Sequence, residues 1–300
     1  MFISYDHYRI FYFVAKYGSF TRAAEALFCN QPNLTRTIRN LETSLGCTLF
    51  ERSNKGVKLT ADGEKLYEHI SIAFEHIQAG EEEISLKKSL HKGIISIGAS
   101  EIALRCFLLP ILNQYRQKYS GIRIKISNVS TPQALSMLKS GLVDLAFVTT
   151  PMETDSDLKQ NKLKSFQEIA ICGEAFRHLS EREEKMTMNE LSLYPIISLG
   201  PKTSTFEFYF RQFIKHGCHF SSDLEVATAD QIMPLVQHNL GIGFVPEDFL
   251  QNQSENDGIY RISLKDEIPY RSISLVKKRG QSLSLPAKEL ERMVVDYLDT

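Results

Sequence analysis

Residues 19–46 read SFTRAAEALFCNQPNLTRTIRNLETSLG, and this stretch decides the fold of the N-terminal part of the chain. Ser19 or Thr21 can cap a short helix whose small residues allow close packing. Asn30 followed by Pro32 is typical of the first turn of another helix, because Asn is a good N-cap and Pro lacks only an N–H that would have no partner there. The stretch therefore predicts two short helices joined by a tight turn.

The second of these helices, from about Pro32 to Leu45, has one apolar and one polar face. Its apolar side chains recur at helical spacing, and they are Leu34, Ile38, Leu41 and Leu45. The polar face offers Arg, Gln, Asn and Thr, which are side chains that contact bases and phosphates in the major groove. The candidate DNA-contacting residues are Thr21, Asn30, Gln31, Pro32, Asn33, Thr35, Arg36 and Arg39.

An earlier helix precedes this pair and ends at Gly18. Its apolar residues are Ile10, Phe13, Val14 and Tyr17, again at helical spacing. Three helices of this kind predict a helix-turn-helix domain with a recognition helix. A small helical bundle whose polar face meets only water has the same spacing and is the alternative.

A basic hairpin is predicted directly after the recognition helix. Leu49 and Phe50 can anchor a strand, and the cationic residues Arg52, Lys55 and Lys58 then bracket Gly56. Residues 1–60 contain eight Lys and Arg against four Asp and Glu, a net charge of +4. Such a wing beside a recognition helix places cations near phosphates.

A long helix over residues 61–88 is predicted next, capped by Thr60. Its seam at alternating steps of four and three consists of Leu66, Ile70, Ala73, Ile77, Gly80 and Ile84. Three Lys against seven Asp and Glu make this segment −4, which cancels the N-terminal excess and leaves the whole chain at −1. A dimer seam explains a long helix behind a DNA-binding domain. A core helix of the following domain is the alternative.

Strands and helices alternate from Gly93 onward, interrupted by a polar stretch over residues 152–164. The alternation predicts two α/β lobes with a ligand cleft beyond the strand ends. Hydroxyl side chains follow these strand ends, at positions where helix N-termini can bind an anion. The candidate effector residues are Ser100, Thr131, Thr149, Thr203 and Ser204. Plain helix capping by these residues is the alternative.

The sequence contains no recognisable catalytic motif and no standard metal-binding motif. HGCH at 216–219 is a dense group of potential ligands, but its spacing is not that of a zinc site. Five widely spaced cysteines fit reduced thiols. We expect no catalytic residues, no metal and no cofactor. No signal peptide or membrane span is recognisable, so we expect a cytoplasmic protein without a membrane partner.

The order of residues resembles the LysR-type family of bacterial transcriptional regulators. The resemblance is carried by FxxVAxxGSFTRAAEAL at 11–27, NQPNLTRTIRNLE at 30–42 and LGCTLFERSNKGVKLTADG at 45–63, and later by SGLVDLAF at 140–147 and LGIGFVP at 240–246. The sequence departs from the family at Asn30, where Ser is frequent, and at Asn33, where a small apolar residue is common.

The resemblance implies an α/β fold class with an N-terminal winged helix-turn-helix, a long linker helix and a two-lobed effector-binding domain of the periplasmic-binding-protein type. The implied domains are 1–60, 61–90 and 91–300, with lobe I formed by 93–163 plus 266–300 and lobe II by 164–265. The implied partners are double-stranded promoter DNA, a small effector that is often an anion, and further copies of the chain in a homotetramer. RNA polymerase is a further candidate partner. A two-lobed binding protein of the periplasmic type, or an enzyme on that scaffold, is the rival class.

Overall fold

Three helices, α1 (Tyr5–Tyr17), α2 (Phe20–Ala26) and α3 (Gln31–Leu45), pack around an apolar core at the start of the chain. Gly18 ends α1 in the left-handed conformation with φ +59°, and the Ser19 hydroxyl caps α2. Leu34, Ile38 and Leu41 are fully buried, as predicted. Leu45 is 39% exposed, which corrects the predicted stripe, because the helix ends there beyond the core.

A two-stranded antiparallel hairpin follows, formed by β1 (Phe50–Ser53) and β2 (Gly56–Leu59). The long helix α4 (Ala61–Ser85) begins directly after it, and the Thr60 hydroxyl accepts a hydrogen bond from the Gly63 N–H at 3.0 Å. Rings of α4 stack on α1, since Phe74 lies 4.6 Å from Tyr12 between ring centroids. The first half of α4 therefore belongs to the N-terminal core.

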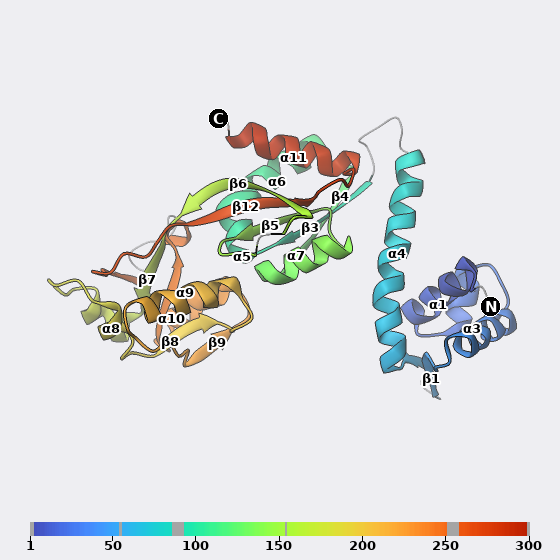
Figure 1. Ribbon diagram of the computed structural model, residues 1–300, viewed down its shortest axis with the longest axis horizontal. Coiled ribbons are helices and arrows are strands. Elements are labelled where there is room, and N and C mark those ends of the chain that lie inside the picture. The colour runs from blue at the N-terminus through green and yellow to red at the C-terminus, as the bar shows by residue number, and fades with distance from the viewer. Residues whose placement is uncertain (1–2, 54–55, 86–92, 154, 251–257, 299–300) are drawn as a thin grey trace. The chain divides into compact units, whose positions relative to one another are not determined.

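The computed structural model describes residues 3–53, 56–85, 93–153, 155–250 and 258–298, and Figure 1 shows their course. The chain divides into two units, residues 1–85 and residues 86–300. The second unit consists of two α/β lobes.

Lobe I contains a five-stranded sheet in the order β4-β3-β5-β12-β6. Its strands are β3 (Gly93–Ala99), β4 (Ile122–Asn128), β5 (Leu145–Thr149), β6 (Leu158–Phe166) and β12 (Arg271–Lys278). The helices are a continuous α5 (Glu101–Ala103), π-helical η1 (Leu104–Leu108) and α6 (Leu109–Lys118), then α7 (Thr131–Ser140) and α11 (Leu285–Leu298). One apolar core joins α6 and α11 to one sheet face, and another joins α7 to the other face (Figure 1).

Lobe II contains the second five-stranded sheet, in the order β11-β7-β10-β8-β9. Its strands are β7 (Glu168–Cys172), β8 (Ile196–Leu199), β9 (Leu224–Val226), β10 (Ile242–Pro246) and β11 (Tyr260–Ile262). Its helical segments are η2 (Glu174–Leu179), α8 (Met188–Leu191), α9 (Ser204–Lys215), η3 (Ala229–Gln231), α10 (Ile232–Gln237) and η4 (Glu247–Leu250). The chain crosses between the lobes twice, from β6 to β7 and from β11 to β12.

The predicted polar stretch over 152–164 is wrong in its second half. Leu158–Phe166 is the edge strand β6, which pairs antiparallel with β12. Most of its side chains are exposed or half-buried because an edge strand meets solvent, so its sequence lacks the apolar run of the inner strands.

Candidate DNA-binding surface and effector cleft

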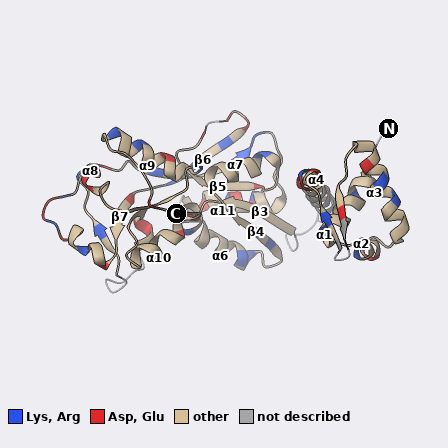
Figure 2. Cartoon of the chain, turned by 90° about the horizontal axis from the view of Figure 1, so that it is seen from below, with Lys and Arg blue, Asp and Glu red and all other residues tan. Residues whose placement is uncertain are grey.

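The outward face of α3 carries the predicted DNA-contacting side chains. Gln31, Pro32, Arg36 and Arg39 are exposed, and Thr35 is half-buried beside them. Together with Asn40 they line a shallow hollow of about 480 Å³ on this face. Figure 2 shows the basic residues of α3 in blue. Burial of the opposite stripe fixes the orientation of this polar face.

Near the turn before α3, some of these side chains form hydrogen bonds with one another. The Thr21 hydroxyl donates to Oε1 of Gln31 at 3.5 Å, and Nδ2 of Asn33 donates to Oδ1 of Asn30 at 3.3 Å. Asn30 occupies the predicted N-cap position, but its side chain makes no capping hydrogen bond to the backbone, since it bonds Asn33 instead. These residues remain exposed.

The hairpin is held against the helices by hydrogen bonds that backbone N–H groups donate to the Glu42 side chain and to a carbonyl group. Oε1 of Glu42 on α3 accepts from the Leu49 and Phe50 N–H groups at 2.8 and 3.3 Å, and the Val57 N–H donates to the Gly18 carbonyl at 3.1 Å. Lys58 is exposed on this hairpin. The predicted side-chain positions of Arg52 and Lys55 lie outside what the structure describes.

All five predicted effector residues line one cavity between the two lobes. Ser100, Thr131 and Thr149 come from lobe I, and Thr203 and Ser204 come from lobe II. The further polar lining residues, which are not among the five candidates, are Asn128, Ser130, Thr205 and Thr228. Asn128, Ser130 and Thr228 lie within two residues of the end of a strand, a signal that the prediction applied only in part, whereas Thr205 lies in the first turn of α9.

Four helix N-termini converge on this cavity. The N-cap residues are Ser100 for α5, Ser130 for α7, Thr203 for α9 and Thr228 for η3, and all four line the cavity. Helix N-termini present free N–H groups and a partial positive charge, which favour an anion. Of the five candidate effector residues, Ser100 and Thr203 cap helices, and all five line the same cavity.

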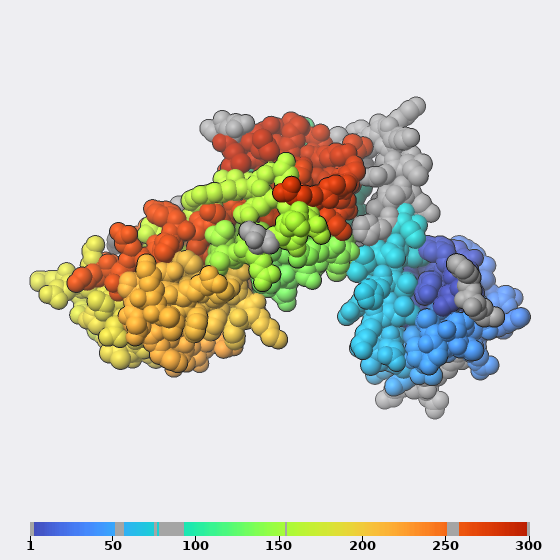
Figure 3. Space-filling model, in the orientation of Figure 1, coloured from blue at the N-terminus to red at the C-terminus, as the bar shows by residue number. Residues whose placement is uncertain are grey.

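The cavity is small and nearly free of formal charge. Its volume is about 30 Å³, which is room for about two water molecules. In the space-filling view the atoms of lobe I and lobe II meet on the face shown (Figure 3). Among the described residues that line the cavity, only Glu101 is ionisable. Burial raises the pKa of its carboxyl, and the nearby Asp230 raises it further.

Behind this lining lies Arg271, which the sequence prediction missed. The side chain is 1% exposed and forms an ion pair with Glu168, which is equally buried. A charged residue at the start of the strand-forming segment RSISLV (271–276) was the signal that could have marked it. Burial raises the pKa of Glu168, and Arg271 offsets part of that rise.

Two of the potential ligands in the HGCH segment contact side chains outside that segment. Nδ1 of His216 lies 3.5 Å from Oδ1 of Asp266, and the buried Cys218 thiol contacts the Asn189 side chain. Within the part of the chain that the structure describes, no group of three or more His, Cys, Asp or Glu side chains is placed to hold a metal ion.

A winged helix-turn-helix followed by two α/β lobes around a polar cleft defines a DNA-binding regulator with a ligand-binding domain. Residues 88–299 match the family model of the LysR substrate binding domain, and residues 5–64 match that of the bacterial regulatory helix-turn-helix protein of the lysR family. The chain belongs to the LysR family of ligand-responsive transcriptional regulators, whose members are not enzymes. The predicted family and fold class are confirmed.

Relatives and solved structures agree with this assignment. The chain is 26% identical over 275 residues to the hydrogen peroxide-inducible genes activator of Haemophilus influenzae, covering 90% of this chain and 89% of the relative. It is 29% identical over 251 residues to the regulator BenM of Acinetobacter baylyi, covering 80% and 79%. Full-length CbnR complexed with its target DNA has a TM-score of 0.72 at 15% identity over 99% of both chains. Full-length BenM has a TM-score of 0.57 at 25% identity over 99% and 96%.

Across the helices that the structure describes, none is both long and apolar enough to cross a membrane.

Proposed function

We propose that this regulator binds double-stranded promoter DNA through α3 and the β1–β2 hairpin, and that a small anion in the interlobe cleft changes that binding. The observation that carries the proposal is α3 itself, which buries Leu34, Ile38 and Leu41 and exposes Gln31, Arg36 and Arg39. Because its ligand is DNA, we place its action in the cytoplasm of a bacterial cell.

We assign different roles to the polar residues. Arg36 and Gln31 read base edges, since Arg pairs with guanine and Gln with adenine. Asn30, Pro32 and Asn33 form the first turn of the recognition helix beside them. The remaining candidates hold phosphates, and they are Thr21, Thr35, Arg39, Arg52, Lys55 and Lys58.

We further propose that α4 joins two copies and that two dimers form a tetramer on DNA. Leu66 and Ile70 of the predicted seam are half-buried against the N-terminal core of their own chain. Ala73 and Ile77, one and two turns further on, are exposed and available to a partner. The side chain of Ile84 lies outside what the structure describes. RNA polymerase is a further partner that we propose for this regulator.

A mobility-shift experiment tests the DNA-binding proposal. The full-length protein is titrated against the intergenic DNA upstream of its own gene, with a variant lacking residues 1–88 as the control. We expect a specific shift at moderate salt from the full-length chain only. Absence of that shift, or an equal shift from the truncated chain, would contradict the proposal.

The two classes of DNA contact differ in their response to substitution. Arg36→Ala is expected to cost about 1–3 kcal/mol on the specific site and little on random DNA, because a base contact is lost. Lys58→Ala is expected to weaken binding to both DNAs and to lower the salt slope by about one, because a phosphate contact is lost. Fluorescence anisotropy at several salt concentrations measures both quantities. An equal loss for Arg36→Ala on both DNAs would exclude its role as a base reader.

Hydrogen peroxide, the signal in the name of one relative, is not the signal that we propose for this chain. Burial raises the pKa of Cys106 and of Cys172 to about 12, and the thiolate is the reactive form of cysteine. We expect native Cys106 and Cys172 to react with iodoacetamide about a thousandfold more slowly than an exposed thiol. The exposed Cys29 is the internal control.

Mass spectrometry of the alkylated native protein measures these rates residue by residue. In urea the differences should vanish, because they arise from burial. Modification of native Cys106 or Cys172 as fast as that of Cys29 would restore a thiol-based signal as a candidate.

A further inference from the structure

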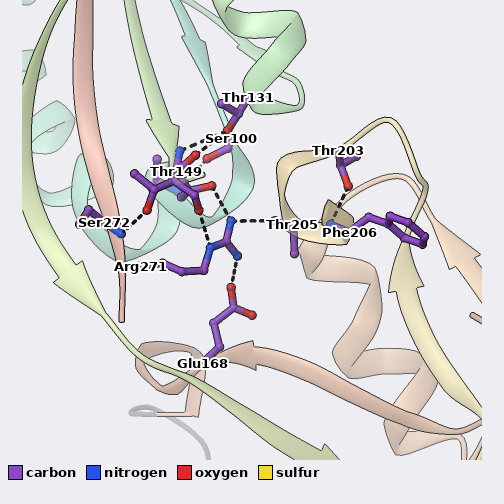
Figure 4. A network of polar contacts seen from close by, with 11 residues as sticks. Ser100, Thr131, Thr149, Glu168, Thr203, Thr205, Phe206, Arg271 and Ser272 are labelled. Atoms are coloured by element: carbon purple, nitrogen blue, oxygen red, sulfur yellow. Dashed lines mark hydrogen bonds and ion pairs between the residues drawn. The ribbon is translucent and has the colours of Figure 1, made fainter. Parts of the chain in front are cut away.

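Arg271, the first residue of β12, buries its guanidinium between the two lobes and bonds both (Figure 4). On the side of lobe I, Nε donates to the Thr150 carbonyl at 2.6 Å and Nη2 donates to the Thr149 hydroxyl at 3.1 Å. On the side of lobe II, Nη2 also donates to the Thr205 hydroxyl at 3.0 Å, and Nη1 donates to the Glu168 carboxylate. The two threonines also line the effector cavity, so Arg271 lies directly behind its wall.

These hydrogen bonds determine what the two threonine hydroxyls can do toward the cavity. A guanidinium has donors and no acceptor, so the oxygens of Thr149 and Thr205 must accept from Arg271. Their own hydrogens then need another acceptor. Among the described residues neither hydroxyl has one. Thr149 is 2% exposed and Thr205 7%, so bulk solvent does not supply one either. Both hydroxyls are left as donors toward the cavity.

Three other hydroxyls of the lining donate their hydrogens to acceptors within the protein. Thr131 donates to the Thr149 carbonyl at 3.2 Å, Thr203 to the Gly200 carbonyl at 2.8 Å, and Ser130 to Oε1 of Gln133 at 2.8 Å. These three have their hydrogens turned into the protein, so their contribution to the cavity is that of a lone pair or a backbone group.

Ser204 and Ser100 provide further hydroxyl donors in the lining of the cavity. It lines the cavity at 7% exposure, and its hydroxyl has no hydrogen-bond partner among the described residues. Ser100 accepts from the Ala103 N–H at 3.3 Å and keeps its own hydrogen free. Four hydroxyls with available hydrogens, from both lobes, therefore surround a space on which four helix N-termini converge.

We propose that Arg271 is a positioning residue that turns Thr149 and Thr205 into donors and thereby makes the cleft selective for a compact oxyanion. The inference rests on the proposed function of the cleft as the effector site. A wall of donors requires a ligand of acceptors, and the about 30 Å³ of space can accommodate a carboxylate group or a small inorganic oxyanion. Arg271 itself does not contact the ligand, because Glu168 pairs with it and the threonines cover it.

The rival role for Arg271 is that of a brace that merely joins the lobes. A brace would affect stability, whereas a positioning residue affects anion affinity through the two threonines. The two roles are separated by a cycle of variants of the full-length protein. Thr149→Val with Thr205→Val removes both hydroxyls at constant shape. Glu168→Met with Arg271→Met removes the guanidinium without leaving a buried charge. The fourth member combines all four substitutions.

Isothermal titration calorimetry measures the binding of acetate, formate, nitrate and sulfate at constant ionic strength, with acetamide as the neutral counterpart of acetate. We expect at least one anion to bind and acetamide not to bind. Replacing the threonine pair and replacing the Glu168–Arg271 pair should each lower the affinity for the anion about tenfold or more, because hydrogen bonds to a charged ligand are lost. The combined variant should lose no more than either pair alone. A higher affinity for acetate and formate than for nitrate and sulfate would identify an organic acid as the effector. A higher affinity for nitrate or sulfate would identify an inorganic oxyanion.

Lys277→Met with Glu291→Met, a half-buried ion pair on β12 and α11 away from the cavity, is the matched control and should bind the anion like the original protein. Circular dichroism verifies that each variant is folded. Three results would each overturn the proposal. The folded Glu168–Arg271 variant could keep its anion affinity, or the losses of affinity in the combined variant could be fully multiplicative. Acetamide could also bind as tightly as acetate. The absence of any anion binding by a protein that shifts its DNA would overturn the proposal as well. Failure of the DNA shift with anion binding intact would instead overturn the proposed function and leave the selectivity standing.

Discussion

Replacing Arg271 alone by methionine is expected to destabilise the two-lobed domain by about 3–5 kcal/mol, because Glu168 is left as an unpaired buried charge. The carboxylate is 2% exposed as a residue, and its Oε2 has no hydrogen-bond partner in the structure even with Arg271 present. In the part of the chain that the structure describes, no cation other than Arg271 pairs with Glu168. Chemical unfolding of the full-length protein, followed by circular dichroism because the chain contains no tryptophan, measures the loss.

The loss should depend on pH in a direction that the structure predicts. Burial raises the pKa of Glu168, and removal of Arg271 leaves that rise without its offset. An acid whose pKa is raised on folding stabilises the folded state below its ordinary pKa and loses that contribution as pH rises through the folded pKa. The variant should therefore be closer to the original protein at pH 5 than at pH 8.

The paired variant Glu168→Met with Arg271→Met provides the control for this prediction. Replacement of a whole buried ion pair by apolar residues is often close to neutral for stability. The paired variant should be more stable than Arg271→Met alone, and its stability should show no added pH dependence from this site. A single variant as stable as the original protein at pH 8 would mean that Glu168 is not buried as described.

Replacing Gly63 by alanine is expected to destabilise the N-terminal domain by about 3 kcal/mol and to reduce DNA binding at least about tenfold. A Cβ at this position would lie 2.2 Å from the carbonyl oxygen of Leu49. That oxygen also accepts the Thr60 N–H at 3.0 Å, so neither the entry to the hairpin nor the first turn of α4 can move freely. The substitution therefore strains the junction that places the hairpin beside α3.

Gly46→Ala is the matched control, since it adds the same methyl group to the same domain. Gly46 has φ +72° and open space around its Cα, so its replacement costs only about 1–2 kcal/mol of backbone strain. Thermal unfolding and the mobility shift compare the two variants. Gly63→Ala with the stability and DNA affinity of the original protein would show that α4 does not start against Leu49.

Much of the fold could be predicted because its signals are local. Gly18 and Gly46 end helices in the left-handed conformation, Ser19 and Thr60 cap the next ones, and the helical spacing of α3 separates a buried from an exposed face. The strand β6 was not predicted because an edge strand lacks the apolar pattern that marks inner strands.

The candidate effector site could be predicted only in outline. Hydroxyl residues after strand ends indicated Ser100, Thr131, Thr149, Thr203 and Ser204, and all five line one cavity. The sequence did not reveal which of their hydrogens are free. That depends on partners farther along the chain, such as the Thr149 carbonyl for Thr131 and Arg271 for Thr149.

The sequence by itself determined the DNA-binding head, the long helix and the existence of two lobes, because capping, helical period and strand alternation act over a few residues. Only the tertiary structure decided the character of the cleft. Arg271 reaches Thr149 across 122 residues and Thr205 across 66, and only the two crossings between the lobes bring them together. No local pattern encodes such contacts, so the donor wall that we propose for the anion becomes visible only in the folded chain.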